Sequence, residues 1–320
     1  MIHTGFPTHG PTLGDVGEHD VIQAIVNAAP SALNGDDAAV LTPSVPNSRV
    51  VAATDMLVAG RHFTETFTTP YAVGQKAVVQ NFADIEAMGA NPIAALLAIS
   101  APPQTPLAVV EDLARGIGDI TQHWTSELVG GDVTSGSELV ISVTAIGSIG
   151  GNLDALRLNR ARPGQRVIAH GRIGYSAAGL ALLQSGKDIP DEFDVLIQAH
   201  QVPQLTPGSG VVARAAAATA MTHNSDGLIK DVSTLARNSG VCIDLTSVAL
   251  APDAVLTAAG EYLGVDPWQW VLTGGEDHTL IGTCDGSAPV GFRSIGTVSK
   301  GTGVRIDGHE PTYTDGWESF

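Results

Sequence analysis

The feature that most constrains this sequence is an apolar strand that runs directly into oxygen-bearing side chains. Val50 to Ala53 is apolar and prone to form a strand, and Thr54 and Asp55 follow where that strand should end. Aspartates stand in similar places along the chain, at Asp36, Asp37, Asp84, Asp132, Asp226 and Asp277. Side chains at the ends of strands point into the cleft that a sheet opens. We therefore expect these aspartates to converge on one site that holds metal ions.

Each of these aspartates also has a structural explanation, because an aspartate beside glycine is usually a turn or helix-cap residue. Asp55, Asp84 and Asp132 differ, since each follows or faces an apolar segment where an unpaired carboxylate is costly to bury. The chain has only 4 lysines and 12 arginines to pair with them. Oxygen-rich groups without cysteine or paired histidine favour Mg²⁺ over zinc. The expected metal is therefore Mg²⁺.

The charge balance limits the partners of the chain. There are 33 acidic and 16 basic residues, which gives a formal net charge of −17. Such a surface argues against binding to nucleic acid or to an anionic membrane. If the protein binds phosphates, divalent cations must bridge two sets of negative charge.

Length predicts two domains, because 320 residues exceed one ordinary core. A polar, proline-containing stretch after Gly150 marks the expected boundary, with an N-terminal domain over 1–150 and a C-terminal α/β domain over 151–320. The sequence has neither a run of eighteen apolar residues nor a signal peptide, so we expect a cytoplasmic protein. Cys242 and Cys284 are expected to be buried free thiols.

Periodicity predicts an α/β (α+β) fold in which strands, glycine turns and helices alternate. Helices are expected over 18–29, 71–88, 110–124, 177–184, 209–220 and 227–238, and strands over 50–53, 93–99, 139–149, 166–170, 241–245 and 279–283. Ser225 and Asp226 are expected to cap the helix that follows them. Asp307 and Gly308 should form the turn of a hairpin.

Two glycine-rich segments, 130–132 and 171–176, have the composition of loops that hold phosphate through backbone N–H groups, although such turns are often only turns. The sequence lacks the GxxxxGK[ST], GxSxG and HExxH motifs, which disfavours a P-loop kinase, an α/β-hydrolase and a zinc protease. His62 is either a loop histidine satisfied by its neighbours or a ligand-binding residue. Trp317 is either a closing core aromatic or a stacking surface for a flat or cationic ring.

Several short runs, taken together, resemble one family. These are GDDAAV at 35–40, TDMLVAGRHF at 54–63, NFADIEAMGANP at 81–92, GGDVT at 130–134, SDGL at 225–228, GGEDH at 274–278 and GW at 316–317. They span nearly the whole chain and resemble the thiamine-monophosphate kinase family. Its superfamily includes aminoimidazole ribonucleotide synthetase, selenophosphate synthetase and a hydrogenase maturation factor.

The resemblance implies an enzyme that transfers the γ-phosphate of ATP directly to thiamine monophosphate with several Mg²⁺ ions. It implies two α/β domains, of which the first, over 1–150, binds metals and ATP and pairs its sheet across a homodimer. The residues implied are Asp37, Thr54, Asp55, Asp84, Asp132 and Asp226 for the metals, Gly130, Gly131 and Ser225 for ATP, and His62, Glu276 and Trp317 for thiamine monophosphate. Phosphoryl transfer needs two aligned anions and neutralised charge, and no covalent nucleophile.

The sequence departs from the family pattern at four places. His223 stands where the family has an aspartate, so it either ligates a metal or only fills space. Ala53 replaces a hydroxyl residue before Thr54. Leu158 takes the place of an arginine that contacts ATP, and Arg157 is the nearest substitute. Tyr175 also stands where the superfamily's glycine loop tends to carry aspartate.

Two other functions stay open from the sequence. One is a different ATP-dependent enzyme of the superfamily. The selenophosphate enzyme needs an early reactive cysteine, and the hydrogenase factor a C-terminal one, whereas Cys242 is the first cysteine here and the printed chain ends Trp317 to Phe320. The other is a sensor that binds thiamine phosphates without turnover because of the changes at His223 and Ala53.

Overall fold

The computed structural model describes residues 4–33, 39, 41–42 and 45–318. The expectations for Asp36 and Asp37 lie outside these residues. The chain divides into two compact units. Unit 1 comprises Met1–Ile85 and Pro92–Gly151, and unit 2 comprises Glu86–Asn91 and Asn152–Phe320.

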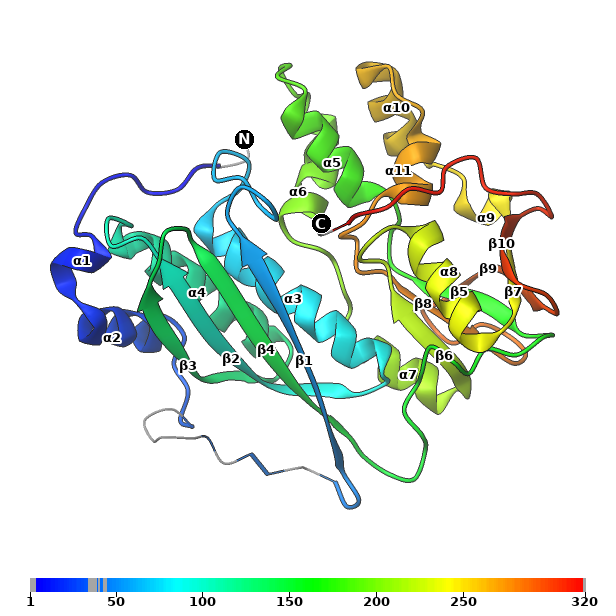
Figure 1. Ribbon diagram of the computed structural model, residues 1–320, viewed down its shortest axis with the longest axis horizontal. Coiled ribbons are helices and arrows are strands. Elements are labelled where there is room, and N and C mark those ends of the chain that lie inside the picture. The colour runs from blue at the N-terminus through cyan, green and yellow to red at the C-terminus, as the bar shows by residue number, and fades with distance from the viewer. Residues whose placement is uncertain (1–3, 34–38, 40, 43–44, 319–320) are drawn as a thin grey trace. The chain divides into compact units, whose positions relative to one another are not determined.

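Unit 1 is built around a four-stranded sheet with the strand order β1-β4-β2-β3. Its elements are α1 (Leu13–Val16), α2 (Glu18–Ala28), β1 (Arg49–Val58), α3 (Pro70–Ala87), β2 (Asn91–Ala101), α4 (Leu107–His123), β3 (Glu127–Ser135) and β4 (Val140–Ile149). Strand β1 pairs antiparallel with β4, whereas β2 and β3 are parallel. Helices α3 and α4 cover one face of the sheet (Figure 1). Strands β1 and β3, at the two ends of the strand order, are the edges of this sheet.

Two glycines let α3 and α4 pack closely. A Cβ atom on Gly74 would lie 2.2 Å from the carbonyl oxygen of Leu113, and one on Gly116 would lie 2.0 Å from that of Tyr71. At both positions, backbone of the other helix occupies the space that a side chain would need, so only glycine fits. The helix α3 is held rigidly against α4 and the sheet in this way, which matters because it carries Asp84.

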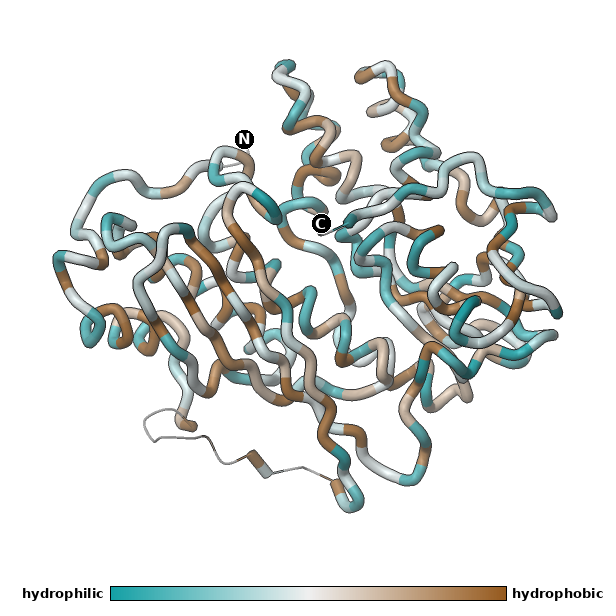
Figure 2. Tube along the Cα trace, in the orientation of Figure 1, coloured by the Kyte–Doolittle hydropathy of each residue, from teal (hydrophilic) through white to brown (hydrophobic). Residues whose placement is uncertain are grey.

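The face of β1 that points away from the helices carries apolar side chains. Figure 2 shows hydrophobic residues along the strands of this sheet. Alternation in β1 buries Leu57 toward the helices and leaves Val50 70% exposed and Met56 58% exposed. A row of exposed apolar side chains on one strand face is typical of an interaction surface.

Unit 2 contains a six-stranded sheet in the order β10-β7-β9-β5-β8-β6. Its elements are β5 (Arg166–His170), α5 (Tyr175–Gln184), the 3₁₀ helix η1 (Asp191–Phe193), α6 (Asp194–Gln201), α7 (Ser209–Ala215), β6 (Ala218–His223), α8 (Leu228–Ser239), β7 (Cys242–Leu245), α9 (Ser247–Leu250), α10 (Ala254–Leu263), α11 (Pro267–Thr273), β8 (Leu280–Cys284), β9 (Arg293–Ser299) and β10 (Gly303–Ile306).

Both faces of this second sheet are covered, as the central strand β5 shows. Val167 and Ala169 belong to a large core with residues of α5, α8 and α11. Ile168, between them in sequence, belongs to a second core with Ala213 of α7 and Met221 of β6. Buried residues that alternate between two cores explain why 166–170 reads as a continuous apolar run.

The mixed α/β fold predicted from periodicity is confirmed, and the strongly periodic helices lie within a few residues of their predicted bounds. The Asp307-Gly308 turn is also confirmed: both residues have positive φ, and Ile306 and His309 form a bridge across it. Both cysteines are buried free thiols, as expected. Within the described residues, no helix has the length and apolarity needed to cross a bilayer.

Three local predictions were wrong. The alanine-rich segment 209–220 forms α7 and then the start of β6, because the chain reverses at Ala217 with φ +62° and pairs with β8. The segment 130–132 is part of β3 and is not a turn. The side chains of Ser225 and Asp226 do not cap α8, whose N-cap residue is Gly227.

Candidate active site

The first group of predicted metal ligands lies where β1 meets α3. Asn81 of α3 is fully buried and accepts a hydrogen bond from the backbone N–H of Asp55 at 2.9 Å. Its amide donates to the carbonyl of Ala77 at 2.8 Å, which fixes the side chain on the helix. Asp84 follows on α3 within one helical turn of Asn81. Asn81 therefore fixes the position of Asp55 relative to α3, the helix that carries Asp84.

Thr54 is held by the neighbouring strand. Its hydroxyl donates to the carbonyl of Val143 at 3.1 Å and accepts from the Thr144 hydroxyl at 3.0 Å. The oxygen therefore has a fixed position on the exposed edge strand. Ala53 has no side-chain oxygen to add to it, as noted from the sequence.

His62 lies in the loop after β1 and has a defined tautomer. Its Nδ1 accepts a hydrogen bond from the backbone N–H of Val58 at 3.0 Å. An accepting Nδ1 carries no proton, so Nε2 bears the proton of the neutral ring. The backbone of Val58 thus satisfies Nδ1 of the ring and orients Nε2 as a donor.

The second group, Gly130, Gly131 and Asp132, lies on β3 at the other edge of the sheet. These residues line a cavity of about 740 Å³ together with residues of α2, β2 and β4. That volume is within the range of small-molecule sites. A Cβ on Gly131 would lie 1.8 Å from the carbonyl oxygen of Leu97, where the β2–β3 pairing has a register shift. Gly131 is therefore required for β3 to lie beside β2.

These two groups are separated within unit 1. Strands β4 and β2 lie between β1 and β3, so three strand spacings, about 14 Å, separate the two edges. Asp55 is opposite the buried Val143, whereas Asp132 is opposite the exposed Ala98. Among the described residues, no group of three or more His, Cys, Asp or Glu side chains is placed to hold a metal ion.

In unit 2 the structure brings two predicted segments together. The backbone N–H of Glu276 donates to the carbonyl of Ser225 at 2.9 Å, and the N–H of His278 donates to that of Asn224 at 2.9 Å. Gly275 packs so closely that a Cβ there would lie 2.2 Å from the Ser225 carbonyl oxygen. The proposed ATP-binding and substrate-binding loops are thus one structural unit.

Asp226 and Trp317 are also neighbours. The backbone N–H of Trp317 donates to the carbonyl of Asp226 at 2.9 Å. Lys230 lies 3.4 Å from the Asp226 carboxylate and also donates to the carbonyl of Trp317. The Trp317 side chain is 45% exposed, so it does not close a core. Its indole is placed as a surface on which a ring can stack.

Glu276 faces a histidine that the sequence did not point out. Its carboxylate lies 3.6 Å from Nδ1 of His200, which is buried and also contacts the Ser176 hydroxyl at 3.2 Å. Glu276 itself has φ +62°, an uncommon conformation for a residue with a side chain. Strained conformations of this kind concentrate at functional sites.

Asp277, which was expected to join the metal site, serves another purpose. Its buried carboxylate accepts hydrogen bonds from the backbone N–H groups of Gly174 at 2.6 Å and Ser176 at 2.8 Å, at the start of α5. Burial raises the pKa of Asp277 to about 7, against these hydrogen bonds, which lower it. The side chain fastens the glycine loop 171–176 to the GGEDH segment.

His223 lies beside a second histidine. Its Nδ1 is 3.1 Å from Nδ1 of His278, and the two rings are stacked with centroids 5.3 Å apart. Nearby, the carboxylate of Asp231 accepts from the backbone N–H of Asp226 at 3.0 Å, and burial raises the pKa of Asp231 to about 6.

Arg157 is exposed in the segment before β5. Whether His223 or Arg157 contacts a ligand stays a prediction.

Known proteins resemble the chain over nearly its whole length. Residues 35–149 match the family described as AIR synthase related protein, N-terminal domain. A thiamine-monophosphate kinase of Corynebacterium glutamicum is 59% identical over 316 residues, which cover 97% of this chain and 96% of that protein. This chain belongs to the thiamine-monophosphate kinase family. The family member of Mycobacterium tuberculosis is 43% identical over 320 residues, covering 98% of this chain and 94% of its own.

A solved structure of the same family has the same fold. AaThiL complexed with AMPPCP and TMP superposes with a TM-score of 0.77 at 30% identity, covering 95% of this chain and 97% of its own. The likeness therefore extends over both units of this chain.

Sequence reasoning missed three residues that hold the predicted ones in place, Asn81, His200 and Lys230, and it gave Asp277 a different role from the one that its hydrogen bonds indicate. Asn81 carried a signal, because a polar amide in an apolar helix must find a buried partner. Lys230 follows Asp226 by four residues, a spacing that places opposite charges together at the start of a helix. His200 and Asp277 gave no comparable signal, since their partners are far away in sequence.

Proposed function

We propose that this protein is a thiamine-monophosphate kinase, which transfers the γ-phosphate of ATP directly to thiamine monophosphate and releases thiamine diphosphate and ADP. The main support for this proposal is the 59% identity to a thiamine-monophosphate kinase over 97% of the chain. The relative solved with AMPPCP and TMP supports the same pair of ligands. We place the reaction in the cytoplasm, where ATP is made and where free thiols such as Cys242 stay reduced.

The donor chemistry fits Mg²⁺. Thr54, Asp55, Asp84, Asp132 and Asp226 offer hydroxyl or carboxylate oxygens, the ligands that Mg²⁺ prefers, and Asp37 would add another carboxylate. When bound, Mg²⁺ neutralises phosphate charge and orients the phosphates. In a protein with a net charge of −17, that neutralisation is needed for two anionic substrates to bind at all.

The chain itself supplies positioning. Gly130 and Gly131 line the 740 Å³ cavity without side chains, so backbone can approach ATP, and the fixed Ser225 loop contributes a hydroxyl. Glu276 opposes the positive charge of the thiazolium ring, the exposed indole of Trp317 stacks on it, and the Nε2–H of His62 donates to the substrate phosphate. Arg157 adds positive charge near ATP.

We also propose a homodimer, in which a second copy covers the exposed face of β1. Val50 and Met56 form an apolar row on that face. The carboxylates of Asp55 and Asp132 lie at opposite edges of one sheet, so one chain does not bring them to a common ion. A second copy packed on this face can bring Thr54 of one protomer, which shares the face with Val50 and Met56, toward Asp132 of its partner.

Product analysis tests the proposed reaction. The purified protein is incubated with ATP, Mg²⁺ and thiamine monophosphate, and in parallel with thiamine or an aminoimidazole ribonucleotide pathway substrate. We expect thiamine diphosphate only from thiamine monophosphate. ADP without thiamine diphosphate would favour another enzyme of the superfamily. Tight binding of thiamine monophosphate without turnover would favour the sensor.

A further inference from the structure

Unit 2 contains a cavity whose lining includes none of the predicted site residues. It has a volume of about 420 Å³ and lies between the segment 153–162, the end of α7, the start of β6 and Asp285 after β8. Buried Leu156, Ala161 and Ala218 give it an apolar floor. The size and the lining are those of a site for one small molecule.

Positive charge is concentrated around this cavity. Arg160, Arg162 and Arg214 line it, against the carboxylates of Asp154 and Asp285. The lining therefore has a net charge of +1, from three positive and two negative groups, in a chain whose net charge is −17. Three of the 12 arginines of the protein occur here. A local reversal of charge of this kind favours an anionic ligand.

The ion pairs that Arg160 and Arg162 form are exposed. Arg160 lies 3.1 Å from Asp154, with side chains 51% and 66% exposed, and Arg162 lies 2.7 Å from Asp285, with side chains 61% and 63% exposed. Ion pairs this exposed contribute little to stability. A phosphate group, which accepts two parallel hydrogen bonds from one guanidinium, can replace the carboxylate as partner.

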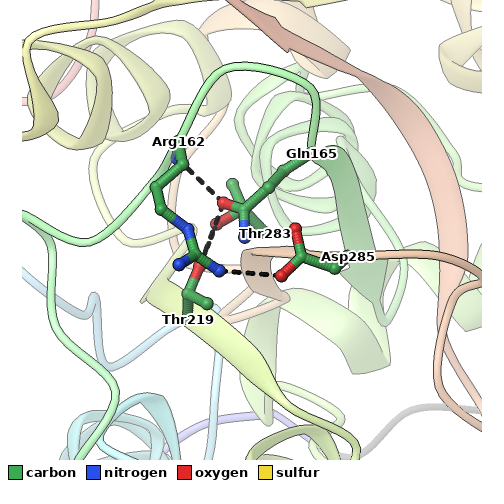
Figure 3. Close-up of polar contacts among 5 residues, drawn as sticks. All are labelled: Arg162, Gln165, Thr219, Thr283 and Asp285. Carbon is green, nitrogen blue, oxygen red and sulfur yellow. Dashed lines mark hydrogen bonds and ion pairs between the residues drawn. The ribbon is translucent and has the colours of Figure 1, made fainter.

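A buried glutamine connects the residues of the cavity wall (Figure 3). The carbonyl oxygen of Gln165 accepts from the backbone N–H of Arg162 at 2.9 Å and from the Thr219 hydroxyl at 3.0 Å. Its amide nitrogen donates to Asp285 at 3.2 Å. Asp285 therefore keeps a donor, and Arg162 keeps its backbone position, if the guanidinium turns to a ligand.

The cavity is distant from Ser225 and Asp226, whereas Arg157 belongs to the segment 153–162 but does not line the cavity. Ala218 and Thr219 are at the beginning of β6, whereas Ser225 and Asp226 follow its end at His223. Five residues of extended strand separate the two ends by about 17 Å. The cavity is therefore at the opposite end of β6 from the loop that carries Ser225 and Asp226.

We propose that this cavity binds a small molecule that carries a phosphate or diphosphate group, held by Arg160, Arg162 and Arg214 at a site separate from the candidate active site. The guanidinium groups contact the phosphate oxygens, and the apolar floor accommodates the remainder of the ligand. Nucleotides, thiamine diphosphate and inorganic pyrophosphate share this chemistry.

Calorimetric titration with inorganic pyrophosphate tests the proposal on the full chain. EDTA is present, because the proposed active site needs Mg²⁺ to hold phosphates and is silent without it. We expect saturable binding that Arg160→Ala and Arg162→Ala each weaken about tenfold, the loss of one charged hydrogen bond. Arg162→Lys keeps the charge without the planar fork and should weaken binding less. Arg237→Ala, at an exposed arginine of α8, is the matched control and should bind like the wild type.

Titrations with ATP and with thiamine diphosphate under the same conditions distinguish the possible sources of the phosphate, and the tighter ligand identifies the source. Thermal unfolding of each variant verifies that it is folded. The proposal would be overturned by the absence of saturable pyrophosphate binding or by equal binding to folded Arg160→Ala, Arg162→Ala and wild type. It would also be overturned if Arg162→Ala raised the KM for ATP and AMPPCP displaced pyrophosphate, since the cavity would then belong to the nucleotide site.

Discussion

At the scale of single residues, side chains that look alike in sequence have different environments. Asp55 and Asp132 are exposed on edge strands, whereas Asp277 is buried and fastened to the start of α5. All three follow the same pattern of an aspartate beside an apolar segment. The sequence could predict which residues bear oxygen. It could not predict which of them face solvent, because that depends on partners such as Gly174 and Ser176, about a hundred positions away.

The exposed carboxylates should be needed for turnover and dispensable for folding. Asp55→Asn and Asp132→Asn each keep the shape of the side chain and remove the charge that would hold Mg²⁺. We expect each to lower kcat/KM by about 100-fold or more, with an unchanged Tm. Steady-state kinetics and thermal unfolding measure this, with Asp188→Asn, an exposed aspartate outside the proposed site, as the control. Near-normal turnover in either variant would contradict the metal assignment.

Asp277 should make stability depend on pH. Its pKa is about 7 in the folded protein and 3.8 in a model peptide. Between these values the folded state binds more protons than the unfolded state, so the free energy of unfolding should fall as pH rises from about 4 to about 7. Asp277→Asn should lose this part of the dependence. Urea unfolding at about pH 5 and about pH 8 measures it. Parallel curves for wild type and variant would show that Asp277 does not titrate in this range.

At the scale of elements, periodicity located the helices better than the strands that carry the site. Helix α4 repeats apolar residues every three or four positions, which was sufficient to place it. Strand β3 contains two adjacent glycines, which suggested a turn. Its strand conformation could not be predicted, because the register shift that accommodates the glycines depends on the pairing with β2. Strand β6 follows an alanine-rich helix without any alternation to mark the change. Both misses come from pairing with distant strands.

The two glycines of β3 should respond differently to substitution. Gly131→Ala places a Cβ 1.8 Å from the carbonyl oxygen of Leu97, whereas the nearest atom to a Cβ on Gly130 is the flexible Leu96 side chain at 3.4 Å. We expect Gly131→Ala to destabilise the protein by about 1–3 kcal/mol, the usual cost of overpacking, and Gly130→Ala to cost much less. Chemical unfolding measures both. Equal stabilities would mean that β3 does not pair with β2 as described.

At the scale of the whole molecule, the two units and the family could be read from the order of motifs along the chain. The family is shown by the relatives. The separation of Asp55 and Asp132 at the two edges of one sheet could not be read from sequence, since it follows from the strand order β1-β4-β2-β3. This separation is the physical reason for proposing that two protomers share the site.

The proposed dimer should depend on the exposed face of β1. Met56→Glu places a charge in the apolar row that a second copy would bury, so we expect dissociation to a monomer with reduced turnover. Light scattering after size-exclusion chromatography gives the mass. Val290→Glu changes a valine of unit 2 that is 89% exposed and should leave the mass unaffected. A wild-type protein that is already monomeric would rule out the proposed sharing of the site.

The central claim is direct transfer of the γ-phosphate from ATP to thiamine monophosphate. Incubation with Mg²⁺ and ATP labelled in the γ-phosphate, followed by separation of the products, tests it most directly. The account predicts labelled thiamine diphosphate in amounts equal to ADP, and a strongly reduced amount of both products from Asp132→Asn. Label found only in inorganic phosphate, or thiamine diphosphate formed equally well by Asp132→Asn, would contradict it.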